Sequence, residues 1–415
     1  MPKQSVELLA PAGNESRLSI TLNYGADAVY FGANDFGLRS VARGFDEESL
    51  ARAIERVQRA GRRCYVVLNI FAHNRDLVPL REHLQSLARN APDGVIVSDP
   101  GVFDLVSQVA PSTPIHISTQ ANVTNAGAAR FWQRLGATRI VLARELSLRE
   151  IHEIRDSCDL ELEAFVHGAM CMAYSGRCFL SAAMTGRSAN AGECTNSCRW
   201  NYRLIEENRL ESPFPIEQDG RGSYILSARD LCMLGHLKEL RAAGVSCFKI
   251  EGRNRGLEYL AVVLSAYRQT LDSNHAEPTI AGWVAELERL SSHGLSTGFY
   301  FDGTPQYPPH ARTGQPALRG ATRFAGVTED RDGAIGIVTL QRLSVTDQIE
   351  VLSSRRYSFF ACSVRSLTDR CEIGAGDWLD LSPVPGIRAG ELVRLQLATP
   401  EERGQATLAR PVGTP

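Results

Sequence analysis

The 415-residue sequence has no long hydrophobic run and no strong excess of charge of either sign. No apolar stretch reaches the roughly 18 residues that a membrane-spanning helix needs, so we expect no membrane partner. The first residues, MPKQSVELLAPAGNES, hold one Lys and no long apolar segment, which argues against a secretory signal. We therefore expect a cytoplasmic protein whose cysteines stay reduced. The formal net charge of −2 excludes a generally basic, histone-like binder but not a local basic groove.

Three motifs that would identify a chemistry are also missing. The sequence has no GxGxxG, which argues against a dinucleotide site, and no HExxH, which argues against a zinc peptidase. It has no C-x-x-C either, the usual spacing of a redox dithiol. With 43% hydrophobic and 22% charged residues, the composition is that of an ordinary globular protein. The length suffices for two domains or for one large barrel with an appendage.

What is present is a regular alternation of apolar runs and amphipathic segments up to about residue 270. Segments such as EESLARAIERVQRAGR place apolar residues at i, i+3 and i+4, as helices do. Buried strands joined by amphipathic helices predict a parallel sheet, and eight of them predict an α/β fold, a closed (β/α)8 barrel of the TIM type. An open doubly wound sheet is the alternative. The apolar runs are residues 6–10, 28–32, 64–69, 94–99, 114–119, 139–144, 160–168 and 247–252.

The alternation is interrupted once, by a long cysteine-bearing insertion at about 168–246 between the seventh and eighth runs. Barrel loops of that length are usually functional. We expect a TIM-like catalytic barrel over 1–300 and a Gly- and Pro-rich linker over 301–320. Short β runs such as AIGIVTL and YSFFAC then predict a small accessory β-barrel domain over 321–415.

Four of the ten cysteines fall in this insertion with the spacing C-x6-C-x15-C-x3-C. The first pair is too widely spaced for an ordinary zinc site, whereas iron–sulfur clusters tolerate such gaps. A Cys–His nucleophile using His167 and Cys171 would leave three cysteines unexplained. Packing in a hydrophobic core fits poorly, because GRC, GEC and NSC are polar surroundings. We therefore expect Cys171, Cys178, Cys194 and Cys198 to bind a cluster or metal, with Cys232, just inside a helical pattern, in reserve.

The same insertion is both cationic and aromatic. Arg177 and Arg199 lie near Trp200, and guanidinium groups pair with phosphates while aromatic faces stack on unpaired bases. Four arginines in a long loop, here Arg177, Arg187, Arg199 and Arg203, are often only a solvated surface. Their position beside the cysteines favours a nucleic-acid contact.

Polar residues recur at the carboxyl ends of the expected strands, where TIM barrels have their active sites. In FKIEGR the three charged residues alternate, which predicts one face pointing into the barrel mouth. An internal ion pair that merely closes the barrel is the competing interpretation. We expect substrate contacts from Asn69, Gln120, Arg144, Arg177, Arg199 and Trp200, and catalytic roles for His167, Lys249, Glu251 and Arg253.

Five segments together resemble a known family. ELLAPAGN, GADAVYFG, HGAMCMAYSGRC, CTNSCRW and FKIEGR are similar to motifs of the U32 peptidase-like, or collagenase-like, family. The resemblance covers about residues 5–300 and is greatest to its prephenate-dependent tRNA uridine hydroxylases. It implies a 4Fe-4S cluster on Cys171, Cys178, Cys194 and Cys198. A ubiquinone-hydroxylating branch has one ligand elsewhere in the chain, which keeps Cys232 in consideration.

The resemblance also implies an activity. Members of this branch convert the wobble uridine in the tRNA anticodon loop to 5-hydroxyuridine, with prephenate as the small anionic co-substrate. An electron donor, which the sequence does not identify, would complete the set of partners. Two other functions stay under consideration: a U32-type peptidase, and a cluster-binding assembly partner without catalysis.

Overall fold

The computed structural model describes residues 6–32, 36, 44–171, 176–191, 194–200, 217–219, 222–224, 229–291, 294–301 and 322–397. The expected linker, 301–320, therefore lies almost wholly outside the described residues. Among the described residues, none of the helices combines the length and the apolar character needed to cross a bilayer.

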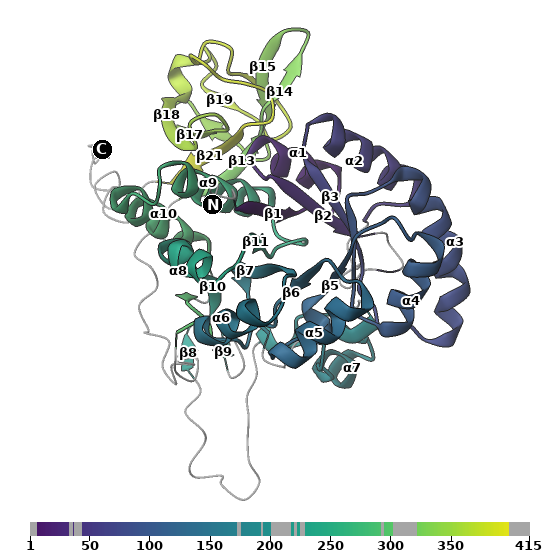
Figure 1. The fold of residues 1–415 in the computed structure, drawn as a ribbon. Helices are drawn as coiled ribbons and strands as arrows, with labels where there is room; N and C mark the ends of the chain where they lie inside the picture. The colour runs from purple at the N-terminus through teal and green to yellow at the C-terminus, as the bar shows by residue number, and fades with distance from the viewer. Residues whose placement is uncertain are drawn as a thin grey trace, which may run out of the picture.

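The centre of the molecule is a closed barrel of parallel strands surrounded by helices (Figure 1). Each strand pairs with the next along the chain, and β11 closes the barrel by pairing with both β1 and β7. The predicted TIM-like barrel is thus confirmed. Its strands are β1 (Glu7–Pro11), β2 (Ala28–Gly32), β3 (Arg63–Leu68), β4 (Gly94–Val97), β5 (Ile115–Ile117), β6 (Arg139–Val141), β7 (Glu161–Ala169) and β11 (Cys247–Ile250).

Polar caps begin several of the surrounding helices. Asn14, Asp46 and Asp99 each accept hydrogen bonds from backbone N–H groups of the first turn that follows. Ser147 and Glu150 form a reciprocal capping box. The helices are α1 (Glu15–Asn23), α2 (Glu47–Arg59), α3 (Asn74–Asn90), α4 (Pro100–Val109), α5 (Ala126–Leu135), α6 (Leu148–Ser157), α8 (Leu237–Ala242), α9 (Leu257–Asp272) and α10 (Glu277–Leu290).

The eight apolar runs match the eight barrel strands, but several strands end earlier than expected. The fourth run was expected to reach Asp99, and β4 ends at Val97 because Asp99 caps α4. The fifth run was expected to reach Thr119, and β5 ends at Ile117 because Ser118 caps the short 3₁₀ helix η1 (Thr119–Ala121). The capping side chains thus end these strands and leave polar groups at the carboxyl end of the barrel.

The expectation that Cys232 lies in a helix is wrong. It lies on β10 (Asp230–Cys232), which pairs antiparallel with the last residues of β7. β7 is nine residues long and extends beyond its pairing with β6, which stops at Glu163, so the edge opposite β11 is open to another strand. β12 (Leu295–Ser296) adds to β10 in turn. The other elements between β7 and β10 are α7 (Leu180–Thr185), η2 (Ala189–Ala191), η3 (Ser197–Arg199) and the β8 (Glu217–Asp219) and β9 (Gly222–Tyr224) pair; η4 (Leu234–His236) follows β10.

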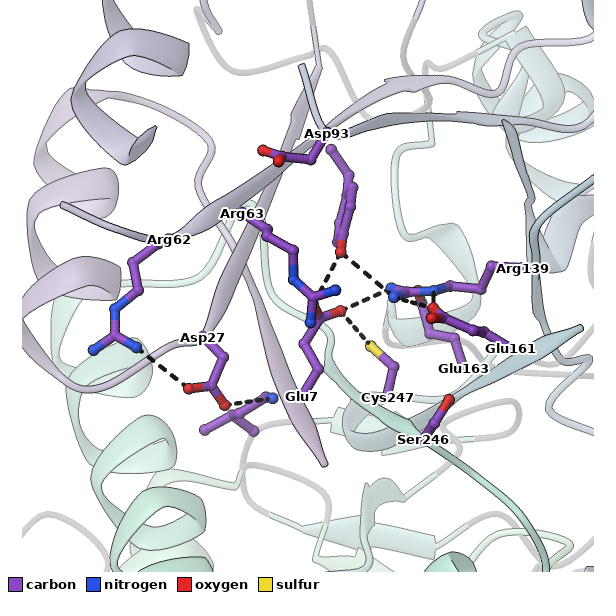
Figure 2. A network of polar contacts seen from close by, with 12 residues as sticks. Glu7, Asp27, Arg62, Arg63, Asp93, Arg139, Glu161, Glu163, Ser246 and Cys247 are labelled. Atoms are coloured by element: carbon purple, nitrogen blue, oxygen red, sulfur yellow. Dashed lines mark hydrogen bonds and ion pairs between the residues drawn. The ribbon is translucent and has the colours of Figure 1, made fainter. Parts of the chain in front are cut away.

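A network of charged side chains fills the amino-terminal end of the barrel (Figure 2). Arg139 contacts Glu7 at 2.8 Å, Glu161 at 2.5 Å and Glu163 at 3.2 Å. The hydroxyl of Tyr65 donates to Glu7 at 2.9 Å. These residues come from β1, β3, β6 and β7, so the network ties together strands that are distant in sequence. It lies at the end of the barrel opposite the one at which TIM-barrel enzymes bind substrate.

Small antiparallel sheets follow at the carboxyl-terminal part of the chain, as expected. One has the order β13-β21-β17-β18, a second β14-β15-β20 and a third β16-β19. They enclose a second hydrophobic core that includes Ile337, Val351 and Val393. The strands are β13 (Thr322–Val327), β14 (Glu329–Arg331), β15 (Ala334–Val338), β16 (Leu343–Ser344), β17 (Gln348–Ser353), β18 (Ser358–Ser363), β19 (Glu372–Ile373), β20 (Trp378–Asp380) and β21 (Leu392–Gln396), with η5 (Val364–Ser366).

The carboxyl-terminal sheets pack against the barrel beside α1 and α9 (Figure 1). The buried hydroxyl of Tyr24 donates to the Leu352 carbonyl and accepts from the Leu392 amide, both at 2.8 Å. Arg394 on β21 reaches Glu286 on α10 at 3.0 Å. Leu352 and Leu392 belong to the hydrophobic core of the barrel itself. The boundaries drawn at residues 300 and 320 stay predictions.

Candidate functional site

The carboxyl end of β7 leads directly to the first cysteine of the insertion. Arg144, which follows β6, holds this end in place: its Nη1 donates to the Ala169 carbonyl at 3.1 Å and lies 3.7 Å from Cys171 Sγ. The guanidinium carbon lies 3.9 Å from the centre of the Phe165 ring. Arg144 is buried and Cys171 is exposed. The Cys171 sulfur thus lies at the surface beside a fixed positive charge.

Gly176, where the described chain resumes after Cys171, lies beside the ends of β3 and β5. A Cβ placed on Gly176 would lie 2.4 Å from the Gln120 carbonyl oxygen and 3.1 Å from the Phe71 ring, so the backbone passes very close to both. The Phe71 amide donates to the Asn190 carbonyl at 3.4 Å. Phe71 follows β3 and Gln120 follows β5. The described residues of the cysteine segment (171, 176–191 and 194–200) therefore lie at the carboxyl-terminal face of the barrel, from the end of β7 to the ends of β3 and β5.

Three of the four cysteines lie around the short helix α7. Cys178 is two residues before its start, and Cys194 Sγ lies 3.9 Å from Ser181 Oγ on its first turn. The Thr195 amide donates to the same Ser181 hydroxyl at 3.2 Å. η3, which carries Cys198, packs against α7. Cys178, Cys194 and Cys198 are all partly exposed, and no cysteine of the described chain is in a disulfide.

The donor chemistry of this segment fits an iron–sulfur cluster, because four reduced thiols flank one helix and one strand end. Within the described residues, no three His, Cys, Asp or Glu side chains converge as the ligands of a single metal ion do. Each thiolate of a 4Fe-4S cluster binds a different iron, so convergence on one point is not required. The set of four ligands stays a prediction.

Two predicted substrate residues lie near each other beyond the ends of β3 and β5, the two strands that flank β4. Asn69 Nδ2 donates to Ser118 Oγ at 3.3 Å, and the Ser98 hydroxyl donates to the Asn69 carbonyl at 3.2 Å. Gln120 comes two residues after Ser118, and its amide donates to the Ser118 hydroxyl at 3.3 Å. Asn69 and Gln120 thus belong to one polar cluster over β3, β4 and β5, next to Gly176 of the cysteine segment.

Arg253 lies across the ends of β1 and β2. A Cβ on Gly32 would be 2.7 Å from Nη2 of Arg253, and a Cβ on Gly13 would be 2.2 Å from its carbonyl oxygen. Arg253 therefore occupies space that is available only because positions 13 and 32 are glycines. Arg253 is only 9% exposed. Glu251 is also buried, and its amide donates to the His167 carbonyl at 2.8 Å. Both residues lie at the carboxyl end of the barrel, as predicted.

The predicted alternation of FKIEGR onto one face ends before Glu251. β11 stops at Ile250, and its register with β7 shifts between Lys249 and Ile250. Lys249 Nζ contacts Glu163 at 2.6 Å inside the barrel and lies 4.4 Å from the centre of the Tyr30 ring. Glu163 has no exposed surface and also contacts Arg139. Lys249 is therefore part of an interior ion pair, although with a different partner from those considered from the sequence.

His167 faces helix α9. Its ring packs against the rings of Tyr259 and Tyr267, and its Nδ1 lies 3.4 Å from the Tyr267 hydroxyl. Burial lowers the pKa of His167 to about 4, so the ring is neutral at neutral pH. Cys232 is its neighbour on β10, and burial raises the pKa of that thiol. The structure thus places His167 and Cys232 in the packing between β7, β10 and α9.

The insertion also exposes side chains suited to a large partner. Arg177 is exposed, Phe179 is 75% exposed and Trp200 is 42% exposed. Arg199 lies on η3, and its side chain is outside the described part of the structure. These residues belong to the same segment as the cysteines. The roles predicted for them from the sequence stay predictions.

One hydrolase motif does occur in the sequence and bears on the peptidase alternative. Gly294 to Gly298 read GLSTG, a G-x-S-x-G pattern. In α/β hydrolases the serine lies on a tight turn between a strand and a helix. Here Ser296 lies in the two-residue strand β12, and its hydroxyl accepts from the Gly298 amide at 3.4 Å. The strand-to-helix turn that the motif requires is therefore not found at Ser296.

Comparison with known proteins gives a consistent result. The family model named peptidase family U32 matches residues 13–307. The chain is 38% identical over 340 residues to tRNA hydroxylation protein P1 of Bacillus subtilis, covering 81% of this chain and 80% of that protein. It is 33% identical to tRNA hydroxylation protein P of Escherichia coli, with 92% of each chain covered. It is 34% identical to the 23S rRNA 5-hydroxycytidine C2501 synthase of Escherichia coli, covering 78% of this chain and 48% of that one.

Proposed function

This chain belongs to peptidase family U32. From the relatives named above we propose that it is an RNA-modifying enzyme. Its reaction would be the hydroxylation of the wobble uridine of tRNA to 5-hydroxyuridine. The reaction would depend on a 4Fe-4S cluster and use prephenate as the hydroxyl source. The observation that carries the proposal is the cysteine segment, which lies across the carboxyl-terminal face of a TIM-like barrel.

The position of this segment supports a role in catalysis, because TIM-barrel enzymes have their active sites at that face. A cluster held there by Cys171, Cys178, Cys194 and Cys198 would be next to any substrate in the barrel mouth. The names of the relatives support RNA hydroxylation: two concern tRNA and the third 5-hydroxycytidine in rRNA.

The polar residues of the face can be assigned roles from their chemistry. Arg253 presents a guanidinium, which pairs with carboxylates in a two-pronged geometry, and prephenate has two carboxylates. Asn69 and Gln120 carry amide groups that can pair with the edge of a base. The base has to leave the stack to bring its C5 atom to the barrel mouth, which is easiest in an anticodon loop.

The exposed part of the insertion would contact the rest of the tRNA. Phe179 and Trp200 offer flat apolar faces for stacking on unpaired bases, and Arg177 offers a charge for phosphates. When bound, the cluster would supply electron transfer or Lewis acidity, tuned by the groups around its sulfurs. The chain itself would bind the tRNA and the co-substrate, orient them and exclude water.

A peptidase is the competing function, because it is what the family is named for. The sequence has no HExxH, and Ser296 of its G-x-S-x-G pattern does not lie on a strand-to-helix turn. His167, which could pair with a nucleophilic Cys171, faces α9 instead. These observations favour the hydroxylase over the peptidase. An assembly partner without catalysis would share the cluster but not the activity.

The test begins with the protein purified without oxygen and assayed for iron, sulfide and visible absorption. We expect a brown protein that converts uridine to 5-hydroxyuridine in unmodified tRNA when prephenate is added, detected by mass spectrometry of the nucleosides. Cys194→Ala should lose both the iron and the activity at an unchanged melting temperature. Cys371→Ala, an exposed cysteine of the carboxyl-terminal sheets, is the matched control and should behave as wild type.

Three outcomes would contradict the proposal. A colourless wild-type protein that cleaves labelled peptides would favour the peptidase. A brown protein with no effect on tRNA in any condition would favour the assembly partner. Unchanged iron and sulfide in Cys194→Ala would remove this cysteine from the ligand set.

A further inference from the structure

Arg144 lies beside the first cysteine of the insertion and is held there from two sides. Its Nη1 donates to the Ala169 carbonyl at 3.1 Å, and its guanidinium carbon lies 3.9 Å from the centre of the Phe165 ring. Both partners belong to β7, the strand that leads into Cys171. The same Nη1 lies 3.7 Å from Cys171 Sγ. The guanidinium is therefore fixed relative to the sulfur rather than reaching it from a mobile side chain.

From this geometry we infer that Arg144 is a positioning residue for the Cys171 sulfur, and that its charge raises the reduction potential of the cluster bound there. The inference rests on the proposed function, because it requires the cluster. It gives Arg144 a different role from the substrate contact expected from the sequence. Its Nη1 already has two partners in the protein.

The physical reason is the sign of the charge. Reduction adds an electron to a cluster, and a nearby positive charge stabilises the added negative charge. Hydrogen-bond donors that point at the ligand sulfurs also raise the reduction potential. Nearby charge and hydrogen bonds to the sulfurs are both determinants of cluster potentials. Arg144 is only 9% exposed, so salt and water screen its charge less than they would at the surface.

The shape of the guanidinium matters as well as its charge. A planar group can stack on Phe165 while one edge donates to both Ala169 and Cys171. A lysine ammonium has the charge but cannot stack in this way and is more strongly hydrated. Arg144→Lys should therefore keep part of the effect, whereas Arg144→Gln should lose it entirely.

The experiment uses the full chain, loaded with iron and sulfide without oxygen. Midpoint potentials are measured by titration with dithionite and followed by electron paramagnetic resonance, and iron, sulfide and melting temperature are measured on the same preparations. The variants are Arg144→Gln and Arg144→Lys. Arg130→Gln removes an exposed arginine on α5 and is the matched control for the loss of one positive charge.

We expect the midpoint potential to shift to a more negative value in Arg144→Gln, to shift less in Arg144→Lys and to stay unchanged in Arg130→Gln. Loss of iron from Arg144→Gln at an unchanged melting temperature also supports the positioning of Cys171, and the potential is then taken from Arg144→Lys. A wild-type potential in a fully loaded Arg144→Gln overturns the inference. The inference is also overturned if the midpoint potential of Arg130→Gln shifts as much as that of Arg144→Gln. A fall in melting temperature in both Arg144 variants overturns it as well. A wild-type protein that binds no iron contradicts the proposed function itself, which is a separate outcome.

Discussion

Replacing Lys249 by Met tests whether this residue is structural or catalytic. Lys249 Nζ lies 2.6 Å from Glu163, whose side chain has no exposed surface. Burial opposes the ionisation of Glu163, but attraction to Lys249 and Arg139 prevails and holds its pKa below the usual value. Methionine has a similar length and would fill the space without supplying the charge. The variant thus leaves a buried carboxylate with one cationic partner in place of two.

The expected loss of stability follows from these contacts. Removing one partner of a buried ion pair usually costs about 3–5 kcal/mol. Arg139 remains 3.2 Å from Glu163, so the lower end of that range applies. The lost contact between Lys249 and the Tyr30 ring adds about 2 kcal/mol, because the ammonium is desolvated there. We therefore expect Lys249→Met to lower the free energy of unfolding by about 5 kcal/mol.

The assay is urea unfolding followed by circular dichroism, with activity measured on the folded fraction. Lys238→Met, on the exposed surface of α8, is the control and should stay within about 0.5 kcal/mol of wild type. The double variant Lys249→Met with Glu163→Leu removes the stranded carboxylate and should recover at least half of the loss. A loss under 1 kcal/mol with abolished activity would refute the structural role and restore Lys249 as a catalytic residue.

Two further predictions concern the barrel mouth and acid stability. Gly32→Ala should raise KM for prephenate by about tenfold at an unchanged melting temperature, because the new Cβ would displace the flexible end of Arg253. Gly13→Ala should instead cost about 1–3 kcal/mol, because its Cβ would meet backbone; equal stability of the two variants would contradict this reasoning. The pKa of His167 is lowered, so the neutral ring stabilises the folded state above about pH 6.5. We expect the free energy of unfolding to fall by about 3 kcal/mol as the pH is lowered from about 6.5 to about 4. Urea unfolding across this range should show a smaller acid loss in His167→Gln, and an identical pH profile would exclude His167 as its source.

The order and pairing of the barrel strands could be predicted from the sequence, because each strand is a short apolar run between amphipathic helices. The strand ends could not, since Asp99 and Ser118 continue an apolar run but serve as caps. β10 was missed for a different reason. Its three residues have no strand pattern of their own, and they pair because β7 extends past the end of β6 and leaves an edge to fill.

The candidate site was predicted in part. That Arg253 and Glu251 lie at the barrel mouth follows from strand order alone. The interior place of Lys249 depends on Glu163, whose signal was present as a charged residue within the apolar run LELEAFVHG. A charge inside such a run indicates a partner within the barrel. The orientation of His167 could not have been predicted, since it depends on how α9 packs against β7.

The two hydrogen bonds of the Tyr24 hydroxyl affect how the chain unfolds. Its hydroxyl is the shared partner of two carboxyl-terminal strands, and Leu352 and Leu392 complete the hydrophobic core of the barrel. Opening the carboxyl-terminal sheets would therefore expose part of the barrel's own core to water. Regions linked in this way lose their structure together rather than one after the other. Amide protons of α9 and of β21 should then exchange with solvent at similar rates, as parts of one cooperative unit.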